Sequence, residues 1–248
     1  MTRHLSSLLA AAALAPAALA QVPTTTDTTV TYALTWDDVG PGGGAHNGDV
    51  EPGESVLFRI TASFTNQNSV GVFTPPLAGF SSGTIRGLSS AFLDLVGGFT
   101  AQGVWDVSPA HGYGVTPPWN IAGSGGNGVP AAGGTQLTQI QFGQFVAEPA
   151  LINPTNPIVD VFSALWTPTS FAVRWETFQL AASAASNGYA SAVLFQLSPT
   201  QLAAAYCPSN LGSVAVGIGI PAPGSALILT LGLAAAARRR RTPPRARA

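Results

Sequence analysis

The residues that most directly suggest chemistry are a serine flanked by glycines, in the stretch Gly79-Phe80-Ser81-Ser82-Gly83. The pattern G-x-S-x-G is typical of a hydrolase nucleophile, and Asp94 or Asp106 followed by His111 completes the chain order serine, acid, histidine. A nucleophile turn needs a strand before the serine and a helix after it in an α/β sheet. Here Pro75-Pro76 precedes the motif and the surrounding pattern is that of β-strands, so a secreted hydrolase ranks third among the candidate functions.

Acidic side chains crowd the predicted loop of residues 37–54, which is rich in glycine and also contains proline and Asn47. Carboxylate oxygens on such a backbone suit Ca²⁺, and the candidate ligands are Asp37, Asp38, Asp49 and Glu51. The spacing is not that of an EF-hand, and the alternative is an acidic loop that is simply exposed to water. Residues 47–54 (N-G-D-V-E-P-G-E) resemble, over this short stretch, the entry loops of bacterial secreted Ig-like modules.

Aromatic side chains lie in and around a long glycine-rich segment, residues 112–134. Exposed aromatic rings there would stack on sugar rings, which makes a carbohydrate- or exopolysaccharide-binding module the second candidate function. The alternative is that these rings pack the segment onto the core. The residues concerned are Trp105, Tyr113 and Trp119.

Histidine and cysteine indicate no zinc or disulfide chemistry. His46 and His111 are far apart in the chain and lack cysteine or acidic partners at the spacing of metal ligands, so no zinc site is predicted. Cys207 is the only cysteine, which excludes an internal disulfide. It is expected to be a small buried apolar residue, with an intermolecular disulfide or a lipid-modified site as the alternatives. Apart from Ca²⁺ we predict no cofactor.

The elements that must position these residues are mostly strands. Apolar residues alternate with polar ones at Val30, Tyr32, Leu34 and Trp36, and again along residues 56–64, which is the period of half-buried strands. Six or more strands separated by turns predict an all-β body, an Ig-like or jelly-roll β-sandwich with one or two short helices. Further strands are predicted at residues 137–146, 158–166, 171–178 and 189–197.

Two short helices are predicted from local signals. Ser198-Pro199-Thr200-Gln201 has the pattern of a capping box with proline at the first helical position, which predicts a helix through Tyr206 that Pro208 stops. Residues 87–96 (G-L-S-S-A-F-L-D-L-V) are the second candidate helix. The segment 112–134 is expected to be an irregular loop.

The N-terminal 20 residues have the features of a signal peptide. Arg3 and His4 precede an apolar run, and Ala18 and Ala20 form the small-x-small pattern that signal peptidase cleaves. Cleavage after Ala20 would leave Gln21 as the first residue of the mature chain. The predicted layout is therefore a signal helix at residues 1–20, an acidic β-sandwich domain at 21–212 and a tail at 213–248.

The C-terminal tail combines prolines, a short apolar segment and arginines. Fourteen residues, 224–237, separate Pro223 from Arg238, so this predicted transmembrane helix is short for a bilayer unless it recruits residues 214–220. Arginines flanking a membrane segment remain cytoplasmic, which places the body on the outer side, where the signal peptide also sends it. The residues of the motif and its flank are Pro221, Ala222, Pro223, Arg238, Arg239, Arg240 and Arg241, with further arginines up to residue 247.

This tail resembles the PEP-CTERM sorting domain, in which a Pro-Glu-Pro-like motif, one apolar helix and an arginine-rich end follow one another. The resemblance covers about the last 28 residues, and Ala222 stands where the family usually has glutamate. It implies an exported protein of a Gram-negative-type cell envelope, cut near Pro223 by an exosortase. An anchor helix that is never cut is the alternative.

The charge distribution excludes nucleic acid as a partner. Between residues 21 and 220 only Arg59, Arg86 and Arg174 oppose all eleven acidic residues, a net charge of −8 that would repel phosphates. We therefore predict an exported cell-surface or extracellular structural protein, associated with the matrix and without evident catalytic activity. Its predicted partners are signal peptidase, an exosortase-type protease, the membrane through the C-terminal helix, and exopolysaccharide.

Overall fold

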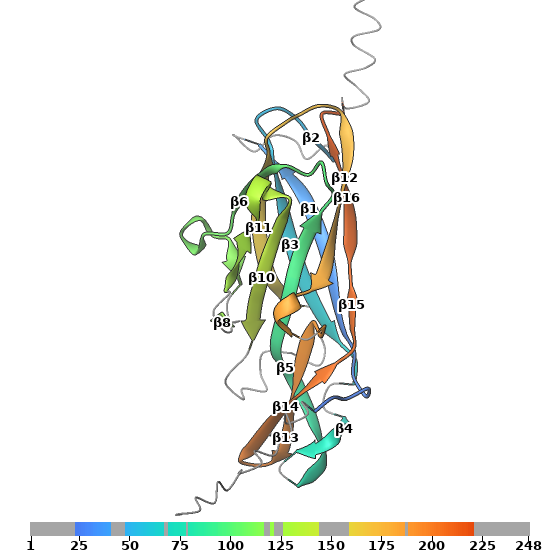
Figure 1. The fold of residues 1–248 in the computed structure, drawn as a ribbon. Coiled ribbons are helices and arrows are strands. Elements are labelled where there is room, and N and C mark those ends of the chain that lie inside the picture. The colour runs from blue at the N-terminus through green and yellow to red at the C-terminus, as the bar shows by residue number, and fades with distance from the viewer. Residues whose placement is uncertain are drawn as a thin grey trace, which may run out of the picture.

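The computed structural model describes residues 23–40, 48–66, 69–77, 79–116, 120–121, 126–143, 159–186 and 188–220. These residues form a mainly β protein whose two sheets pack in a sandwich-like arrangement (Figure 1). The predicted all-β class is therefore confirmed. The predicted signal peptide and the tail beyond Ile220 lie outside these ranges.

The six-stranded sheet follows the alternation seen in the sequence. Its first two long strands are antiparallel, with Val30 opposite Phe64 and Val39 opposite Ser55. Val30, Tyr32 and Leu34 are buried on one face, as are Val56, Phe58 and Ile60 on the neighbouring strand. The sheet has the order β15-β1-β3-β11-β6, with β7 beside β11; the bounds are β1 Val30–Val39, β3 Ser55–Phe64, β6 Gly103–Asp106, β7 Gly114–Val115, β11 Val159–Pro168 and β15 Ser209–Leu211.

The ten-stranded sheet is organised around one long strand, β5, Phe80–Gly97. One edge of β5 pairs first with β13 and then with β12, and the other edge pairs first with β4 and then with β10. The remaining bounds are β2 Asp49–Val50, β4 Val70–Leu77, β8 Asn120–Ile121, β9 Asn127–Pro130, β10 Gln136–Gly143, β12 Arg174–Ala182, β13 Ser191–Ser198, β14 Gln201–Cys207 and β16 Ser213–Ile218.

The beginning of β5 extends past the sandwich and builds a narrower end, which we call the tip. Here β4, β5, β13 and β14 are neighbours in this order. The segment at Thr24 pairs with both outer strands, β4 and β14, and so closes the four strands into a ring. The amide of Thr24 donates to the carbonyl oxygen of Thr74 at 2.8 Å, and the amide of Thr25 donates to that of Tyr206 at 2.8 Å. Phe73 and Phe195 are buried in this end, with ring centroids 5.2 Å apart.

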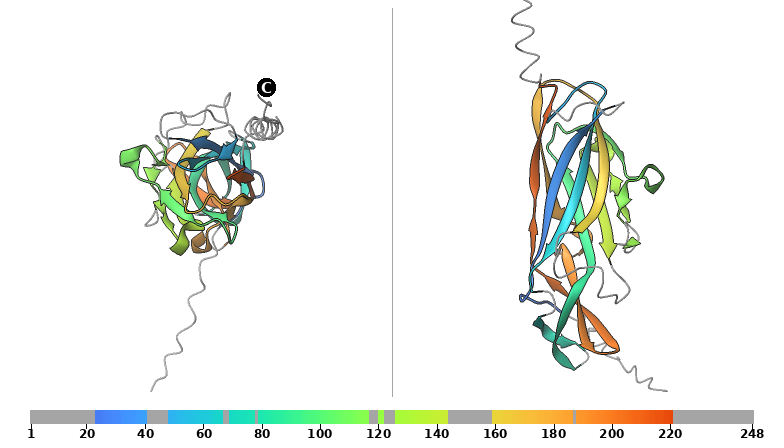
Figure 2. Two further views of the ribbon diagram at one scale, coloured as in Figure 1. Left: turned by 90° about the horizontal axis from the view of Figure 1, so that it is seen from above. Right: turned by 180° about the vertical axis from the view of Figure 1, so that it is seen from behind.

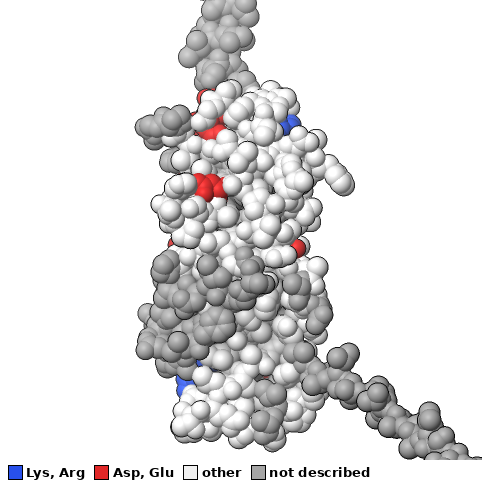
Figure 3. Space-filling view, turned by 60° about the vertical axis from the view of Figure 1, so that its left-hand side comes forward, with Lys and Arg blue, Asp and Glu red and all other residues white. Residues whose placement is uncertain are grey.

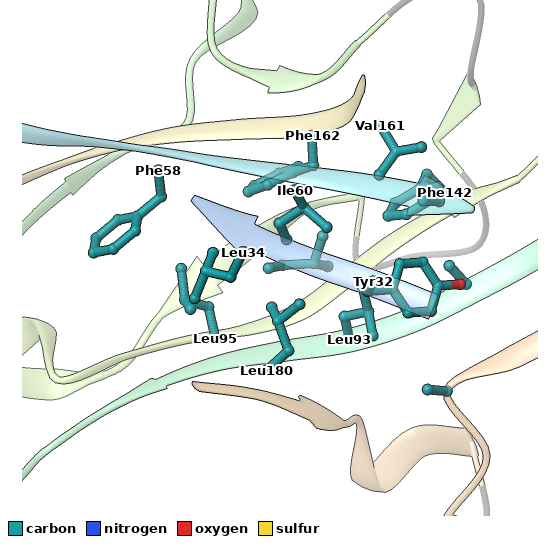
Figure 4. Packing of buried hydrophobic residues seen from close by; sticks show 14 of the residues in the cluster. Tyr32, Leu34, Phe58, Ile60, Leu93, Leu95, Phe142, Val161, Phe162 and Leu180 are labelled. Atoms are coloured by element: carbon teal, nitrogen blue, oxygen red, sulfur yellow. The ribbon is translucent and has the colours of Figure 1, made fainter. Parts of the chain in front are cut away.

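The core lies between the two sheets. Figure 4 shows Tyr32 and Leu34 from β1 directed toward Leu93 and Leu95 from β5 and Leu180 from β12. Aromatic rings reinforce the contact, since Phe58 of β3 and Phe178 of β12 have ring centroids 4.6 Å apart.

The first and last described residues lie at opposite ends of the elongated body (Figures 1 and 2). Pro23 and Thr24 belong to the tip through their bonds to β14 and β4. At the far end β16 finishes beside β2, where Ile218 pairs with Val50 and the amide of Gly219 donates to the carbonyl oxygen of Val50 at 2.8 Å. The chain therefore runs the length of the body between its entry and its exit.

Both predicted helices are wrong, because these residues form strands. Residues 87–96 belong to β5, where Ala91, Leu93 and Leu95 are buried at every second position. Apolar residues on the outer face, Phe92 and Val96, hide this period in the sequence. The described helices are short 3₁₀ turns, namely η1 Pro109–His111, η2 Ala132–Gly134 and η3 Ala184–Ser186.

The predicted capping box is a hairpin turn. Pro199 and Thr200 connect β13 to β14, and Ser198 pairs with Gln201. A helix cap contributes only about 1 kcal/mol. The strand pairing instead buries Ala205 and Cys207, so the tertiary contacts override the local signal.

The other predicted segments agree in part with the structure. The strand predicted at residues 171–178 is displaced to β12, and the segment 112–134 contains the short strands β7, β8 and β9 where it is described. Ser213–Ile218 is β16 and pairs with β12 along its whole length. The folded body thus extends past residue 212 and keeps residues 214–218 within the sheet.

Candidate functional site

The candidate catalytic serine lies in the tip. Gly79, with φ of 87°, turns the chain from β4 into β5, and Ser82 pairs with Val72 across this hairpin. Ser81 therefore sits in a strand-turn-strand unit rather than in the strand-turn-helix unit of a hydrolase nucleophile.

The candidate acid Asp106 and His111 do come together. His111 Nδ1 lies 2.6 Å from Asp106 Oδ2, and the amide of Ser108 donates to Asp106 Oδ1 at 2.9 Å. Pro109 opens η1, and Gly112, with φ of 86°, ends it. The backbone hydrogen bond from Ser108, with a smaller contribution from His111, holds the pKa of Asp106 below its ordinary value.

The acid and histidine pair is separated from the serine. Asp106 ends β6, which pairs with β11 in the six-stranded sheet, whereas Ser81 lies where β5 begins in the other sheet (Figure 1). The second candidate acid, Asp94, accepts a hydrogen bond from the amide of Gln139 at 2.8 Å, where β10 carries a bulge. The structure thus brings together one acid and the histidine but not the serine.

The candidate calcium ligands lie on two different strands and in the turn that follows the second. Asp37 and Asp38 are adjacent in β1, so that they point to opposite faces, and Asp38 is buried. Asp49 lies in β2, opposite Gly217 of β16. Glu51 is held differently, because its amide donates to Glu54 Oε2 at 2.9 Å across a tight turn.

Among the described residues no three histidine, cysteine or acidic side chains gather closely enough to hold a metal ion. Residues 41–47, which include His46, lie outside the described ranges. Charged groups are sparse on the face that Figure 3 shows, where single acidic and basic side chains are surrounded by uncharged ones.

Trp105 does not stack on a ligand, because it is buried in the sandwich. Its indole N–H donates to the carbonyl oxygen of Gly134 at 2.8 Å, and Trp166 donates to the same oxygen at 3.2 Å. Both rings pack against Phe178. Of the two interpretations of Trp105, the structure therefore confirms packing onto the core and not an exposed sugar-binding ring. Tyr113 is half-buried, and Trp119 lies outside the described ranges.

The exposed aromatic residues are different ones. Phe99 follows β5 and is fully exposed, and Trp175 of β12 is 64% exposed. Phe99 lines a shallow hollow of about 260 Å³ together with Ala172 and Arg174. The alternation in β12 would have revealed Trp175, since it shares its strand face with Thr177 and Gln179, whereas Glu176, Phe178 and Leu180 face inward.

Cys207 is a buried thiol next to a hydroxyl network. It is 1% exposed, and its Sγ lies 3.9 Å from the carbonyl oxygen of Ser191. The Ser191 hydroxyl bonds to Tyr32 Oη at 2.7 Å and to Ser209 Oγ at 2.8 Å. This confirms the prediction of a buried residue.

Burial of Cys207 and Tyr32 makes the stability of the folded protein depend on pH in the alkaline range. It raises the pKa of Cys207 from 9.0 to about 12, and it also raises the pKa of Tyr32. Between pH 9 and about pH 12 the Cys207 thiol loses its proton in the unfolded chain but keeps it in the folded protein. Stability present below pH 9 is therefore lost as the pH rises, by about 1.4 kcal/mol per pH unit for one group.

We expect Cys207→Ala to remove the part of this dependence that Cys207 contributes. Urea unfolding between pH 8 and pH 11 should give a steeper loss of unfolding free energy for the wild type than for the variant. Because Tyr32 is retained, the variant should still lose some stability at the alkaline end. Parallel curves for the two proteins would show that the thiol titrates alike in both states.

The residues predicted for sorting lie outside the described ranges. They are Ala18 and Ala20 at the signal cleavage site, and Pro221, Ala222, Pro223 and Arg238 to Arg241 in the tail. Within the described part of the chain, none of the helices has the length and apolar character that crossing a bilayer requires. No protein-family model matches the chain, and no curated protein matches it closely enough to indicate a relative.

Proposed function

We propose that this chain is an exported structural protein of the cell surface or extracellular matrix, held by its C-terminal tail and exposing its tip. The observation that carries the proposal is the position of the two described ends. The exit at Ile220 lies beside β2, at the end of the body opposite β4, β13 and β14 (Figure 1). A tail held in the membrane would therefore leave the tip as the part farthest from it.

The construction of the body supports a mechanical role. β5 runs through both the sandwich and the tip, so the two parts share one strand and its backbone hydrogen bonds. Residues 23–25 close the tip by hydrogen bonds to β4 and β14, and these bonds tie down the segment that would follow signal cleavage. We propose an Ig-like or jelly-roll sandwich as the finer fold class, a proposal supported by the face-to-face contacts between the sheets.

The tail would act as a PEP-CTERM-like sorting signal. In this proposal the arginines first orient the apolar segment in the membrane. An exosortase-type protease then recognises Pro221 to Pro223 and cuts the chain there, which releases the body to the surface or to exopolysaccharide. The acidic body, with net charge −8 between residues 21 and 220, suits an exterior that contains divalent cations.

Mass spectrometry of the mature protein from its native host tests this function. We expect a first residue of Gln21 and a last residue near Pro223. Replacing both Pro221 and Pro223 by alanine should leave the arginines attached, whereas replacing Pro243 and Pro244, which follow the arginines, should leave processing unchanged. An intact chain recovered from the cytosol would contradict the proposal.

A further inference from the structure

The end of the body from which the tail leaves carries exposed apolar side chains. Phe99 is fully exposed, Val173 is 69% exposed and Trp175 is 64% exposed. Trp175 lies on the exposed face of β12, and Val173 immediately precedes that strand. Phe99 lies beside the same segment, since it lines a hollow with Ala172 and Arg174. Large apolar groups gathered on a surface mark a contact with a partner.

Val173 and Trp175 lie beside the point where the chain leaves the sheet. Trp175 pairs with Gly217, and a Cβ at Gly217 would lie 3.4 Å from the Trp175 ring. Gly219, with φ of 65°, packs so closely against the 171–173 segment that a Cβ there would lie 2.1 Å from the carbonyl oxygen of Phe171. The exit is therefore held at a defined position beside Val173 and Trp175.

The length of the remaining chain limits how far this surface can lie from the bilayer. Ile220 ends the described body, and the apolar segment begins at Gly224. Four fully extended peptide units span at most about 14 Å. A tail embedded at Gly224 would thus hold Phe99, Val173 and Trp175 close to the lipid headgroups, where aromatic rings are favourable.

We propose that this surface, made of Phe99, Val173 and Trp175, rests on the outer face of the bilayer that holds residues 224–237. The inference rests on the proposed membrane insertion of the tail. The contact would hold the body upright before processing and would present the 221–223 motif at the interface. It would be lost when the tail is cut.

The neighbouring charge decides which lipids this surface prefers. Asp49 Oδ1 and the Trp175 ring lie on the same side of Gly217. A Cβ added at Gly217 would lie 2.5 Å from Asp49 Oδ1 and 3.4 Å from the Trp175 ring. Glu51 and Glu54 follow in the adjacent turn. Carboxylates so close to the interface are repelled by anionic headgroups, so the contact should be strongest on zwitterionic lipid.

Site-specific labels in the full chain test the contact. We would label Val173→Cys and, separately, the control Val72→Cys with an environment-sensitive fluorophore and reconstitute each in phosphatidylcholine vesicles containing a headgroup nitroxide quencher. Both valines are exposed, and Val72 lies in the tip. Native Cys207 is buried and should not react. A third label, Thr230→Cys, reports on insertion of the apolar segment by quenching from an acyl-chain nitroxide.

We expect the labels at residues 173 and 230 to be quenched and the label at residue 72 to remain bright. Adding phosphatidylglycerol should reduce quenching at residue 173 but not at residue 230. Quenching at residue 230 without quenching at 173 would overturn the contact while leaving the anchored tail intact. Quenching at both 173 and 72 would show a body lying flat and would also overturn it. No quenching at residue 230 would refute the membrane tail and the contact together.

Discussion

Replacing Gly134 by alanine is expected to destabilise the fold by more than about 4 kcal/mol, a large part of the roughly 5–15 kcal/mol by which an ordinary domain is stable. A Cβ at this residue would lie 1.6 Å from the carbonyl oxygen of Gly103, and its φ of 70° is left-handed. Left-handed backbone alone costs about 1–2 kcal/mol for a residue with a side chain. Any shift would also break the hydrogen bonds that Trp105 and Trp166 donate to the Gly134 carbonyl oxygen.

The neighbouring residue is a matched control. Gly133 also has a left-handed φ, 79°, but a Cβ there would meet nothing within 4 Å. Gly133→Ala should therefore cost only the backbone strain, about 1–2 kcal/mol. Urea unfolding followed by tryptophan fluorescence would measure both variants. Equal losses would show that the close approach of Gly134 to Gly103 is not what the fold depends on.

Phe178→Ala should destabilise the protein by about 3–5 kcal/mol, the usual cost of removing a buried aromatic side chain. Phe178 is fully buried in β12 and joins the two sheets. Its ring centroid lies 4.6 Å from that of Phe58, 5.0 Å from that of Trp166 and 6.2 Å from that of Trp105. These three partners belong to β3, β11 and β6 of the opposite sheet.

The same strand provides the control for this variant. Trp175→Ala also removes a large aromatic side chain from β12, but from its exposed face. Its effect on unfolding should lie within about 0.5 kcal/mol. Thermal unfolding monitored by circular dichroism would compare the two. A loss at Trp175 as large as that at Phe178 would mean that the outer face of β12 is covered in the folded protein.

The strands could be predicted where only one face of them is apolar. In β1, Val30, Tyr32 and Leu34 alternate with polar or small residues, and the structure buries these three side chains. In β5 the outer face also carries Phe92 and Val96, so the alternation disappears from the sequence and a helix was predicted. The error at residues 198–206 has another cause, since the capping pattern is local and the strand pairing that replaces it is not.

The placement of the candidate site residues depends more heavily than that of the strands on contacts between residues that are distant in sequence. Asp106 and His111 are five residues apart and meet in the structure, while Ser81 lies in another sheet. The sequence left two interpretations of Trp105 open, exposure to a sugar or packing onto the core, and its burial is decided by Trp166 and Phe178 from strands far along the chain. The exposed positions of Phe99 and Trp175 follow from the same packing, which leaves them outside the core.

Composition and period were sufficient to predict the β class, and the acidic charge of the body follows from composition alone, because each is a property of short stretches of chain. The targeting features of both ends stay predictions. The tertiary structure was needed to show that β5 joins a sandwich to a closed tip, and that the exit of the chain lies at the opposite end, beside Trp175. These features result from pairing between strands that are distant in sequence. No local pattern of residues records which strands become neighbours.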